Sequence, residues 1–340
     1  MQSNPVLPVP LRTEIGWPWE KVQSEILRPD IEDQEQWPHF TIVTPSFNQG
    51  QYLERTIRSV LLQGYPKLNY LIMDGGSKDN SIDVIKYYSN ALAYWRSSPD
   101  EGQSAAIQEG LLGAKSDLVA WLNSDDYYLP GTLESVARIW MENGHPEWIV
   151  GSSRFVNDQG MEIQVWEPDA PRSIGQALSM GAGTPQPSAF WSKQLWDRVG
   201  GLNERLHYCM DEDLWMRFQI AGATPFSTKS LYAVRHLQRE SKTVLQLPRF
   251  ATEFSELVIR HSSFVPSSEK AQWIKGCRSM ARYYGLQTSM SLRNAQLRGA
   301  LRFFQSAWRL SPFWSLTGLG RGLGSAVKTH ARAIIRKSTP

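Results

Sequence analysis

Between residues 40 and 122 the sequence alternates short apolar runs with longer segments of helical period, which restricts the folds open to the chain. Four runs have the length and composition of strands: Phe40–Pro45, Asn69–Met73, Tyr94–Ser97 and Leu118–Leu122. The segments between them carry apolar residues three or four positions apart, as amphipathic helices do. Strands separated by helices pair in parallel, so we expect an α/β fold with a Rossmann-like, mostly parallel sheet and helices on both faces.

The predicted α/β domain covers residues 39–246, and the flanking regions differ from it in composition. Residues 1–38 are rich in proline and tryptophan. We expect them to form an extension that packs on the domain, with one short helix near Trp19–Leu27; disorder is the alternative. Residues 247–340 have a helical pattern and form a predicted C-terminal basic appendage.

Charge is distributed unevenly, although the net charge is only +3. Thirteen Lys and Arg residues but no Asp or Glu follow Glu269, so the first 269 residues hold 23 basic against 33 acidic residues, or −10. One apolar stripe at helical spacing consists of Leu297, Leu301, Phe304 and Trp308. A second short basic helix is predicted at Val327–Arg336. This tail suits an anionic surface, phospholipid or nucleic acid; the alternative is a helical cap with solvated arginines.

Signals for export or membrane insertion are not recognisable in the sequence. Met1–Leu11 contains three prolines and no apolar core of a secretory signal, and no uncharged apolar run approaches the ~20 residues that span a bilayer. The two cysteines, Cys209 and Cys277, lack metal-like spacing. We expect a cytoplasmic protein, peripheral on the inner face of the membrane if the tail binds lipid. The acidic body lacks a basic, aromatic nucleic-acid motif, so no nucleic acid is expected as partner.

Acidic residues follow two of the predicted strands. Asp74 precedes Gly75-Gly76-Ser77, and the apolar run Val119–Leu122 leads to Asp125 and Asp126. Open α/β sheets bind ligands at the carboxyl ends of their strands, and glycine lets a ligand approach the backbone closely. Adjacent carboxylates repel each other, which a divalent cation bridging to phosphate would relieve. An ordinary Asp-Gly or Asp-Asp turn is the alternative.

Three further clusters carry polar groups that chemistry can use. Asp100–Ser104 precedes a helix and forms either a cap or a loop beside a ligand. Asp211, Glu212 and Asp213 begin another helix, where acids are favoured by the helix dipole, yet one of them is a candidate general base. Arg235-His236 ends a late strand and offers a cation and an imidazole.

Five motifs occur together in the order and spacing of one enzyme family. They are Thr44-Pro45-Ser46-Phe47-Asn48, Asp74-Gly75-Gly76-Ser77, Asp100-Glu101-Gly102-Gln103-Ser104, Asn123-Ser124-Asp125-Asp126 and Met210-Asp211-Glu212-Asp213-Leu214-Trp215. From Phe40 to Thr243 the chain resembles the family 2 glycosyltransferases. The resemblance implies the GT-A fold, a nucleotide-diphosphate sugar donor, inversion at the anomeric carbon and a cation, Mg²⁺ or Mn²⁺. It also implies a saccharide or lipid-linked acceptor, in the synthesis of a cell-surface polysaccharide or other glycan.

The resemblance also implies a role for individual residues. Aligning on Asp213-Leu214-Trp215 makes Asp211 the implied catalytic base, with Asp213 as runner-up. Asp126 and His236 are the implied metal ligands. The implied substrate contacts are Pro45, Phe47, Asn48, Asp74, Gly75, Gln103, Asp125, Glu212, Asp213 and Lys242.

The sequence departs from the family pattern at three positions. Met210 stands where Glu is common, Glu212 where an aromatic residue is common, and Ser124 where a strict Asp-x-Asp has its first acid. Two alternatives therefore remain: a degenerate, non-catalytic binding partner, or a sugar-phosphate nucleotidyltransferase. A nucleotidyltransferase is expected to have a Gly-rich basic phosphate loop after the first strand, and Ser46–Tyr52 contains no Lys or Arg.

Overall fold

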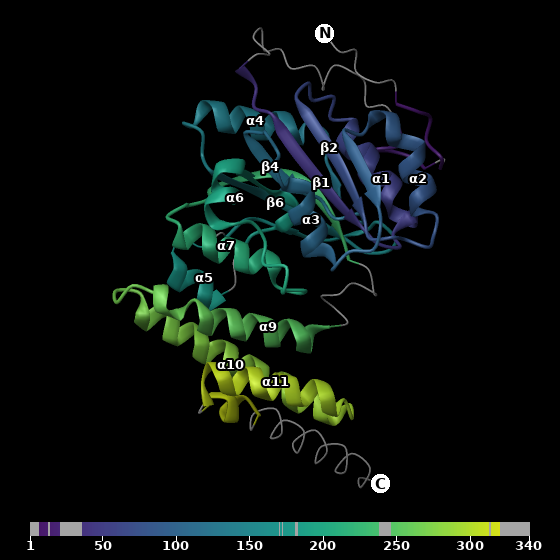
Figure 1. The fold of residues 1–340 in the computed structure, drawn as a ribbon. Coiled ribbons are helices and arrows are strands. Elements are labelled where there is room, and N and C mark those ends of the chain that lie inside the picture. The colour runs from purple at the N-terminus through teal and green to yellow at the C-terminus, as the bar shows by residue number, and fades with distance from the viewer. Residues whose placement is uncertain are drawn as a thin grey trace, which may run out of the picture. The chain divides into compact units, whose positions relative to one another are not determined.

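A computed structural model describes residues 7–12, 14–20, 36–169, 171, 173–180, 183–237, 246–312 and 314–319 (Figure 1). The chain forms two compact units. Unit 1 comprises Met1–Ala170 and Gly183–Arg239, and unit 2 comprises Pro171–Ala182 and Glu240–Pro340. The second unit thus includes a short stretch that interrupts the first in sequence.

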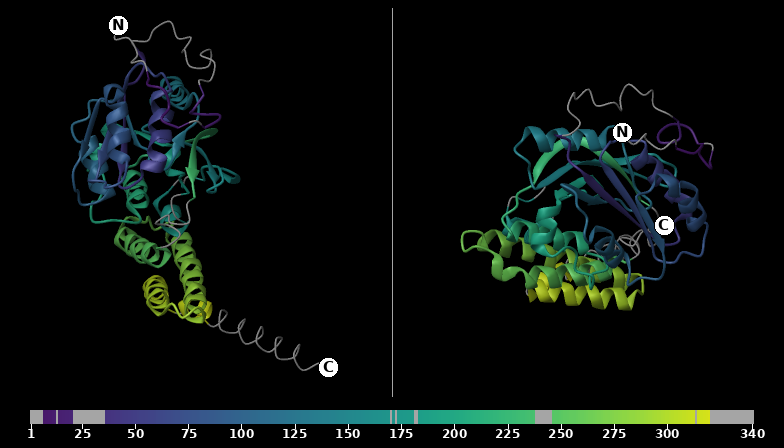
Figure 2. Two further views of the ribbon diagram at one scale, coloured as in Figure 1. Left: turned by 90° about the vertical axis from the view of Figure 1, so that its right-hand side faces the viewer. Right: turned by 45° about the horizontal axis from the view of Figure 1, so that its top comes forward.

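Unit 1 is built on one nine-stranded sheet with the order β3-β2-β1-β4-β8-β6-β9-β5, and β7 pairs with β6 at the side. The strands are β1 Phe40–Ser46, β2 Leu68–Asp74, β3 Tyr94–Ser97, β4 Leu118–Trp121, β5 Tyr127–Tyr128, β6 Trp148–Val156, β7 Glu162–Trp166, β8 Ala189–Ser192 and β9 Phe226–His236. The strands fan out with the usual twist (Figure 2). The four strands expected from residues 40–122 are all present.

The sheet is mixed rather than uniform along its width. The pairs among β3, β2, β1 and β4 are parallel, as are β6 and β9. The pairs β4–β8, β6–β8, β6–β7 and β5–β9 are antiparallel. The alternation of strand and helix thus predicts the parallel half; β5 and β8, too short to show a period, were not recognised.

Helices cover both faces of this sheet. In unit 1 they are α1 Gly50–Leu61, α2 Ser81–Tyr88, α3 Gln103–Leu111, α4 Thr132–Glu142, α6 Lys193–Val199 and α7 Met210–Ile220. Successive crossovers β1–α1–β2 and β2–α2–β3 step in one direction along the sheet, whereas β3–α3–β4 steps back. Because such connections are right-handed, α1 and α2 share one face and α3 lies on the other.

Tryptophans form the core between the middle of the sheet and α7. Trp121, Trp148, Trp191 and Trp215 are all fully buried. The ring of Trp215 stacks at 5.2 Å from Trp148 and at 6.1 Å from Trp121. These stacks fix α7 against β4 and β6, so the position of the first turn of α7 is set by the core.

The described part of the N-terminal extension packs on unit 1. Trp17 Nε1 donates to the carbonyl of Tyr128 at 2.7 Å, and Arg58 Nε donates to that of Pro18 at 3.0 Å. The Leu11 amide donates to the buried carboxylate of Glu54. The helix expected near Trp19–Leu27 lies almost wholly outside the described residues.

Unit 2 is helical. It contains α5 Ile174–Met180, α9 Leu247–Arg260, α10 Lys270–Arg293 and α11 Leu297–Leu310. α10 packs against α11 and α5, and α11 also packs against α9. Within the described residues, no helix has the length and apolarity needed to cross a bilayer. The helix predicted at Val327–Arg336 lies outside the described residues.

Glycine at position 110 sets the approach of α3 to the sheet. A Cβ at Gly110 would lie 2.8 Å from Val43 Cγ1 and 3.1 Å from Met73 Cγ. We expect Gly110→Ala to lower the free energy of unfolding by about 1–3 kcal/mol through overpacking. The control is Gly299→Ala in α11, where the nearest atom would be at 3.5 Å. There, helix propensity should leave stability unchanged or raise it by up to ~1 kcal/mol. Urea unfolding measures both; equal effects would contradict the packing account.

Candidate active site

Three loops meet at the carboxyl ends of β1, β2 and β3. Gly75 donates its amide to the Ser46 carbonyl at 2.8 Å. A Cβ on Gly75 would lie 3.3 Å from the carboxylate of Asp100 and 3.3 Å from Cδ2 of Phe47. The Phe47 side chain is 61% exposed. The Gly75 backbone thus lies between an exposed aromatic ring and a carboxylate. The ring can stack on a planar polar group, and the carboxylate can accept a hydrogen bond from it.

Asp74 organises this loop rather than facing solvent. Its side chain is fully buried. One carboxylate oxygen accepts from the amides of Gly76 and Ser77 and from Ser97 Oγ, and the other accepts from Ser77 Oγ. A carboxylate has about two acceptor sites on each oxygen, so these donors saturate the first oxygen and leave one site on the second.

Pro45 and Asn48 shape the first loop. Pro45 is buried within β1, opposite Met73 of β2. Asn48 adopts a positive φ of 53°, and its Oδ1 accepts from the Lys78 amide at 2.8 Å. Its own amide donates to Ser77 Oγ at 2.8 Å. Asn48 therefore links the first loop to the second.

The two acids after β4 are held in place by one face of α1. Thr56 Oγ1 donates to the carbonyls of Ser124 at 2.9 Å and Asp126 at 2.7 Å. Ser59 Oγ accepts from the amide of Tyr128, and Gln63 Nε2 donates to the Leu129 carbonyl. Thr56 and Ser59 lie on one face of α1, and Gln63 follows shortly after the helix ends at Leu61. The spacing of Thr56 and Ser59 is the signal by which sequence analysis could have found these two.

The carboxylates of Asp125 and Asp126 are electrostatically strained. Burial, followed by the charge of Asp125, raises the pKa of Asp126. Burial also raises the pKa of Asp125, although the charges of Arg235, His236 and Arg55 oppose that shift. The Arg55 guanidinium also lies 4.7 Å over the ring of Tyr127. A cation between these acids would stabilise their ionised forms. Arg55 was not predicted as a site residue.

His236 is placed against Asp126 by β9. Its amide donates to Asp126 Oδ1 at 3.1 Å. The ring lies 5.2 Å from that of Tyr52, and its Nδ1 is buried without a hydrogen-bond partner among the described residues. Burial, with the nearby charge of Arg55, lowers the pKa of His236 and keeps the imidazole neutral. A neutral imidazole with an unused nitrogen is the form that ligates metals.

A divalent cation fits these residues only with help from substrate. Among the described residues, no three His, Cys, Asp or Glu side chains converge. Asp126 and His236 could each supply one ligand atom. That matches Mg²⁺ sites, which use one or two protein ligands and complete the shell with phosphate oxygens and water.

A chain of amide side chains joins three segments beside the acids. Gln103 Nε2 donates to Asn123 Oδ1 at 2.7 Å, and Asn123 Nδ2 donates to Asp126 Oδ2 at 3.3 Å. Gln186 accepts from Asn123 Nδ2 at 3.2 Å and donates to the carbonyl of Trp121. Gln103, predicted as a substrate contact, is thus also part of this chain. Gln186 was not predicted as a site residue.

The first turn of α7 lies beside the start of α3. Ser104 Oγ donates to the carbonyl of Leu206 at 2.8 Å and contacts Met210 Sδ at 2.8 Å. Asp211 and Glu212 are both half-buried. Asp211 Oδ1 accepts a hydrogen bond from the Glu212 amide at 2.9 Å. Ser104 follows Gln103, so the turn that carries Asp211 is next to the amide chain.

Asp213 is in a different environment from Asp211. Its side chain is 2% exposed, and it forms an ion pair with Arg217 at 2.7 Å. A buried carboxylate that is already held by a guanidinium is poorly accessible to an acceptor hydroxyl. Lys242 lies outside the described residues, so its predicted contact with substrate stays a prediction.

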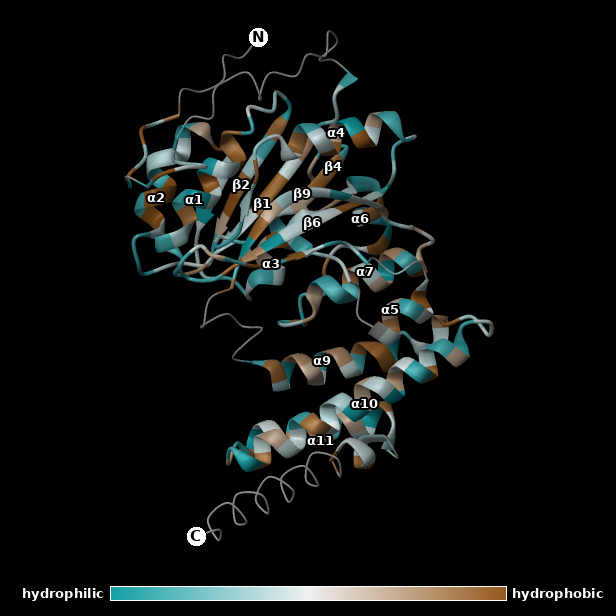
Figure 3. Cartoon of the chain, turned by 180° about the vertical axis from the view of Figure 1, so that it is seen from behind, coloured by the Kyte–Doolittle hydropathy of each residue, from teal (hydrophilic) through white to brown (hydrophobic). Residues whose placement is uncertain are grey.

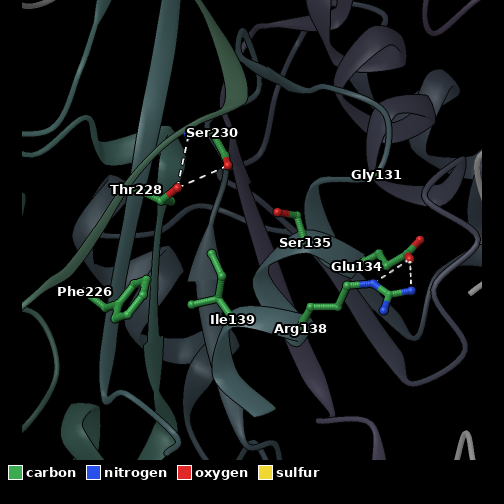
Figure 4. Close-up of a pocket in the computed structure, with 8 residues that line it drawn as sticks. All are labelled: Gly131, Glu134, Ser135, Arg138, Ile139, Phe226, Thr228 and Ser230. Atoms are coloured by element: carbon green, nitrogen blue, oxygen red, sulfur yellow. Dashed lines mark hydrogen bonds and ion pairs between the residues drawn. The ribbon is translucent and has the colours of Figure 1, made fainter. Parts of the chain in front are cut away.

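A separate hollow lies between α4 and the start of β9 (Figure 4). It has a volume of about 560 Å³ and is lined in part by Ser135, Arg138, Phe226 and Thr228. Arg138 is already paired with Glu134 at 2.8 Å. None of the predicted site residues lines this hollow.

The sequence pattern of glycosyl transferase family 2 matches residues 41–177. An uncharacterised glycosyltransferase of Rickettsia felis is 23% identical over 252 residues. This match covers 70% of the chain but only 40% of the Rickettsia protein.

Two solved structures are similar in fold. S. aureus TarS, in complex with UDP-GlcNAc, matches with a TM-score of 0.51 and 16% identity, over 79% of this chain and 91% of that one. The mannosyltransferase PcManGT of Pyrobaculum calidifontis, in complex with GDP-Man and Mn²⁺, matches with a TM-score of 0.54 and 14% identity. That match covers 90% of this chain and 84% of PcManGT.

The hydrogen bonds by which α1 holds the segment with the two acids can be tested at Thr56. We expect Thr56→Val to lower the free energy of unfolding by about 1–3 kcal/mol, because two buried carbonyls lose their shared donor. Thr56→Ser keeps the hydroxyl and is the matched control, expected to cost less. Denaturant unfolding of both variants measures the difference. A Val variant as stable as the Ser variant would show that the hydroxyl is not needed.

Proposed function

We propose that this chain, whose residues 41–177 match the pattern of glycosyl transferase family 2 and whose fold is of the GT-A type, belongs to that family and is an inverting, metal-dependent glycosyltransferase. It moves a sugar from a nucleotide-diphosphate donor to a hydroxyl of a saccharide or lipid-linked acceptor. The observation that carries this proposal is the pair of half-buried Asp125 and buried Asp126 at the carboxyl end of β4, whose pKa values are both raised. Such a pair favours a cation and, through it, a diphosphate.

The donor is proposed to lie across the carboxyl ends of β1, β2 and β4. The base stacks on Phe47 over Gly75, and Asp100 is the nearest carboxylate that could accept its N–H group. Asp74 is the other proposed contact of the base, and its hydrogen bonds to Gly76, Ser77 and Ser97 also fix the loop. Asp125 is the proposed ribose or sugar contact. The complexes of TarS with UDP-GlcNAc and of PcManGT with GDP-Man support a nucleotide sugar as the donor class.

Asp126 and His236 are the proposed protein ligands of Mg²⁺ or Mn²⁺. When bound, the cation neutralises charge that develops on the leaving diphosphate. The Mn²⁺ in the PcManGT complex supports this choice of metal. In the chain itself, the amide of His236 and the side chain of Asn123 orient the Asp126 carboxylate.

Asp211 is the proposed general base. It accepts the proton of the acceptor hydroxyl as that oxygen attacks the anomeric carbon from the face opposite the diphosphate. Asp213 is buried and paired with Arg217, which favours Asp211 over it. The Trp215 stack holds α7, and with it Asp211, on the sheet. The acceptor belongs to the synthesis of a cell-surface polysaccharide or other glycan in this proposal.

The rival functions fit the site less well. A sugar-phosphate nucleotidyltransferase would use a basic phosphate loop after the first strand, and residues 46–52 hold no Lys or Arg. A degenerate binding partner would not need to retain both the acid pair and an acid at position 211. The departures at Met210 and Glu212 are consistent with an active site, because Met210 packs on Ser104.

A thermal-shift screen of nucleoside diphosphates and their sugars, with and without Mn²⁺ or Mg²⁺, tests the donor site. A ligand that binds the folded state raises the melting temperature by mass action. We expect one nucleotide family to give a metal-dependent shift, and Asp126→Ala to abolish it. Asp83→Ala, which removes an exposed carboxylate on α2, is the control and should keep the full shift. If folded, metal-loaded protein gives no shift with any nucleotide, the degenerate binding partner becomes the better explanation.

The base assignment is tested with Asp211→Asn, using the donor that the screen identifies. We expect unchanged donor binding and a fall in turnover of about 10²–10⁴-fold, because only proton removal is lost. Release of nucleoside diphosphate in the presence of candidate acceptors measures turnover.

Asp213→Asn is the matched control for that experiment. It should lower the melting temperature, since the pair with Arg217 is lost, yet keep turnover per folded molecule. Full activity of Asp211→Asn, together with loss in Asp213→Asn, would transfer the role to Asp213.

A further inference from the structure

Helix α11 leaves an apolar stripe open to solvent. Leu297, Leu301 and Trp308 are 69%, 57% and 47% exposed, and Phe304 is half-buried. The rings of Phe304 and Trp308 lie 5.8 Å apart. Hydrophobic and hydrophilic segments alternate along α10 and α11 in Figure 3. Exposed large side chains grouped in this way mark an interaction surface.

The stripe is distinct from the face by which α11 packs in unit 2. At about 100° per residue, the four stripe residues fall within roughly 60° of one another. The buried residues of α11 fall on other sides of the helix and are Ala300, Phe303, Ser306, Ala307 and Leu310. Packing against α9 and α10 therefore does not account for the stripe.

Positive charge lies along one edge of the stripe. Arg298 and Arg302 are exposed and form no ion pair within the described residues. Arg309, on the same flank, is instead paired with Glu256 of α9 at 3.2 Å. The sequence contains no Asp or Glu after Glu269, so no acidic side chain in α10 or α11 offsets these arginines.

We propose that α11 docks along the surface of an anionic phospholipid bilayer. Its leucines and Trp308 enter the boundary between headgroups and acyl chains, while Arg298 and Arg302 contact lipid phosphates. Apolar residues beside unpaired arginines on one helix are the features that interfacial helices need. A nucleic acid would use the arginines but leave the leucines in water. A second copy of the chain would set the same arginines against each other unless acids faced them.

This docking is independent of sugar transfer. It needs neither the donor nor the acid pair of unit 1, so its failure would leave the proposed function untouched. Failure of transfer would likewise leave the docking surface standing.

The test uses the full chain and co-sedimentation with phosphatidylcholine vesicles that contain about 30% phosphatidylglycerol, compared with pure phosphatidylcholine. Wild-type protein should bind the anionic vesicles, and binding should weaken as salt screens the charges. Leu301→Ser/Trp308→Ser should weaken binding at least about tenfold, as loss of two apolar contacts predicts. Arg298→Gln/Arg302→Gln should weaken it by a similar factor and reduce its salt dependence.

Met161→Ser/Ile163→Ser is the matched control, because both residues are exposed and apolar but belong to unit 1. It should bind as wild type does. Wild-type binding in both α11 variants would overturn the proposal and place the contact elsewhere in the chain. Binding to a DNA duplex but not to vesicles would overturn it as well, as would self-association that the Leu301→Ser/Trp308→Ser change abolishes. Melting curves check that each variant is folded. If the Leu301→Ser/Trp308→Ser variant is unfolded, the Arg298→Gln/Arg302→Gln variant still decides the test.

Discussion

The placement of two adjacent carboxylates, half-buried Asp125 and buried Asp126, at the end of β4 is the constraint on which the rest of unit 1 depends. Their pKa values are raised because protein replaces the water around them. Removing ionised carboxylates from water costs free energy, so other contacts must hold this segment in place. Three elements hold it: α1 through Thr56, β9 through the amide of His236, and the loop after β4 through Asn123. Since the restraints from Thr56 and His236 come from distant parts of the sequence, the site forms only when the sheet and α1 are assembled. The strain that remains is of the kind a cation relieves.

Helix α1 serves two structures at once. One of its faces presents Thr56 to the acid segment, while Glu54 and Arg58 hold the described part of the N-terminal extension. The extension in turn reaches the same segment, because Trp17 donates to the carbonyl of Tyr128. A region that reads in sequence as an irregular Pro- and Trp-rich leader therefore supports the strand next to the acids. Trp17 serves there as an anchor.

Periodicity and strand-end acids are local properties, and they predicted the parallel half of the sheet and the place of Asp125 and Asp126. What sequence could not supply is which polar groups meet across the fold. The position of Asp74 after a strand predicted a ligand contact but gave no sign that its carboxylate also accepts from Gly76, Ser77 and Ser97. Asp213 was the runner-up to Asp211 as catalytic base, and the structure pairs its carboxylate with Arg217. Gln186 lies 63 residues from Asn123 and carried no signal of their hydrogen bond.

The distribution of charge links these features. The first 269 residues carry −10, so a nucleotide diphosphate approaches a body of its own sign. Binding of the diphosphate then requires a locally positive electrostatic potential. Arg55 contributes to it, because its charge lies near Asp125 and opposes the rise in the pKa of that carboxyl. A divalent cation held by Asp126 would add to that local potential without changing the long-range field, which salt screens within about 10 Å. The same body would be repelled by an anionic bilayer. In the proposed docking, the acid-free helix α11 would supply attraction at short range, and the donor and the anionic surface would then bind to different regions of the chain.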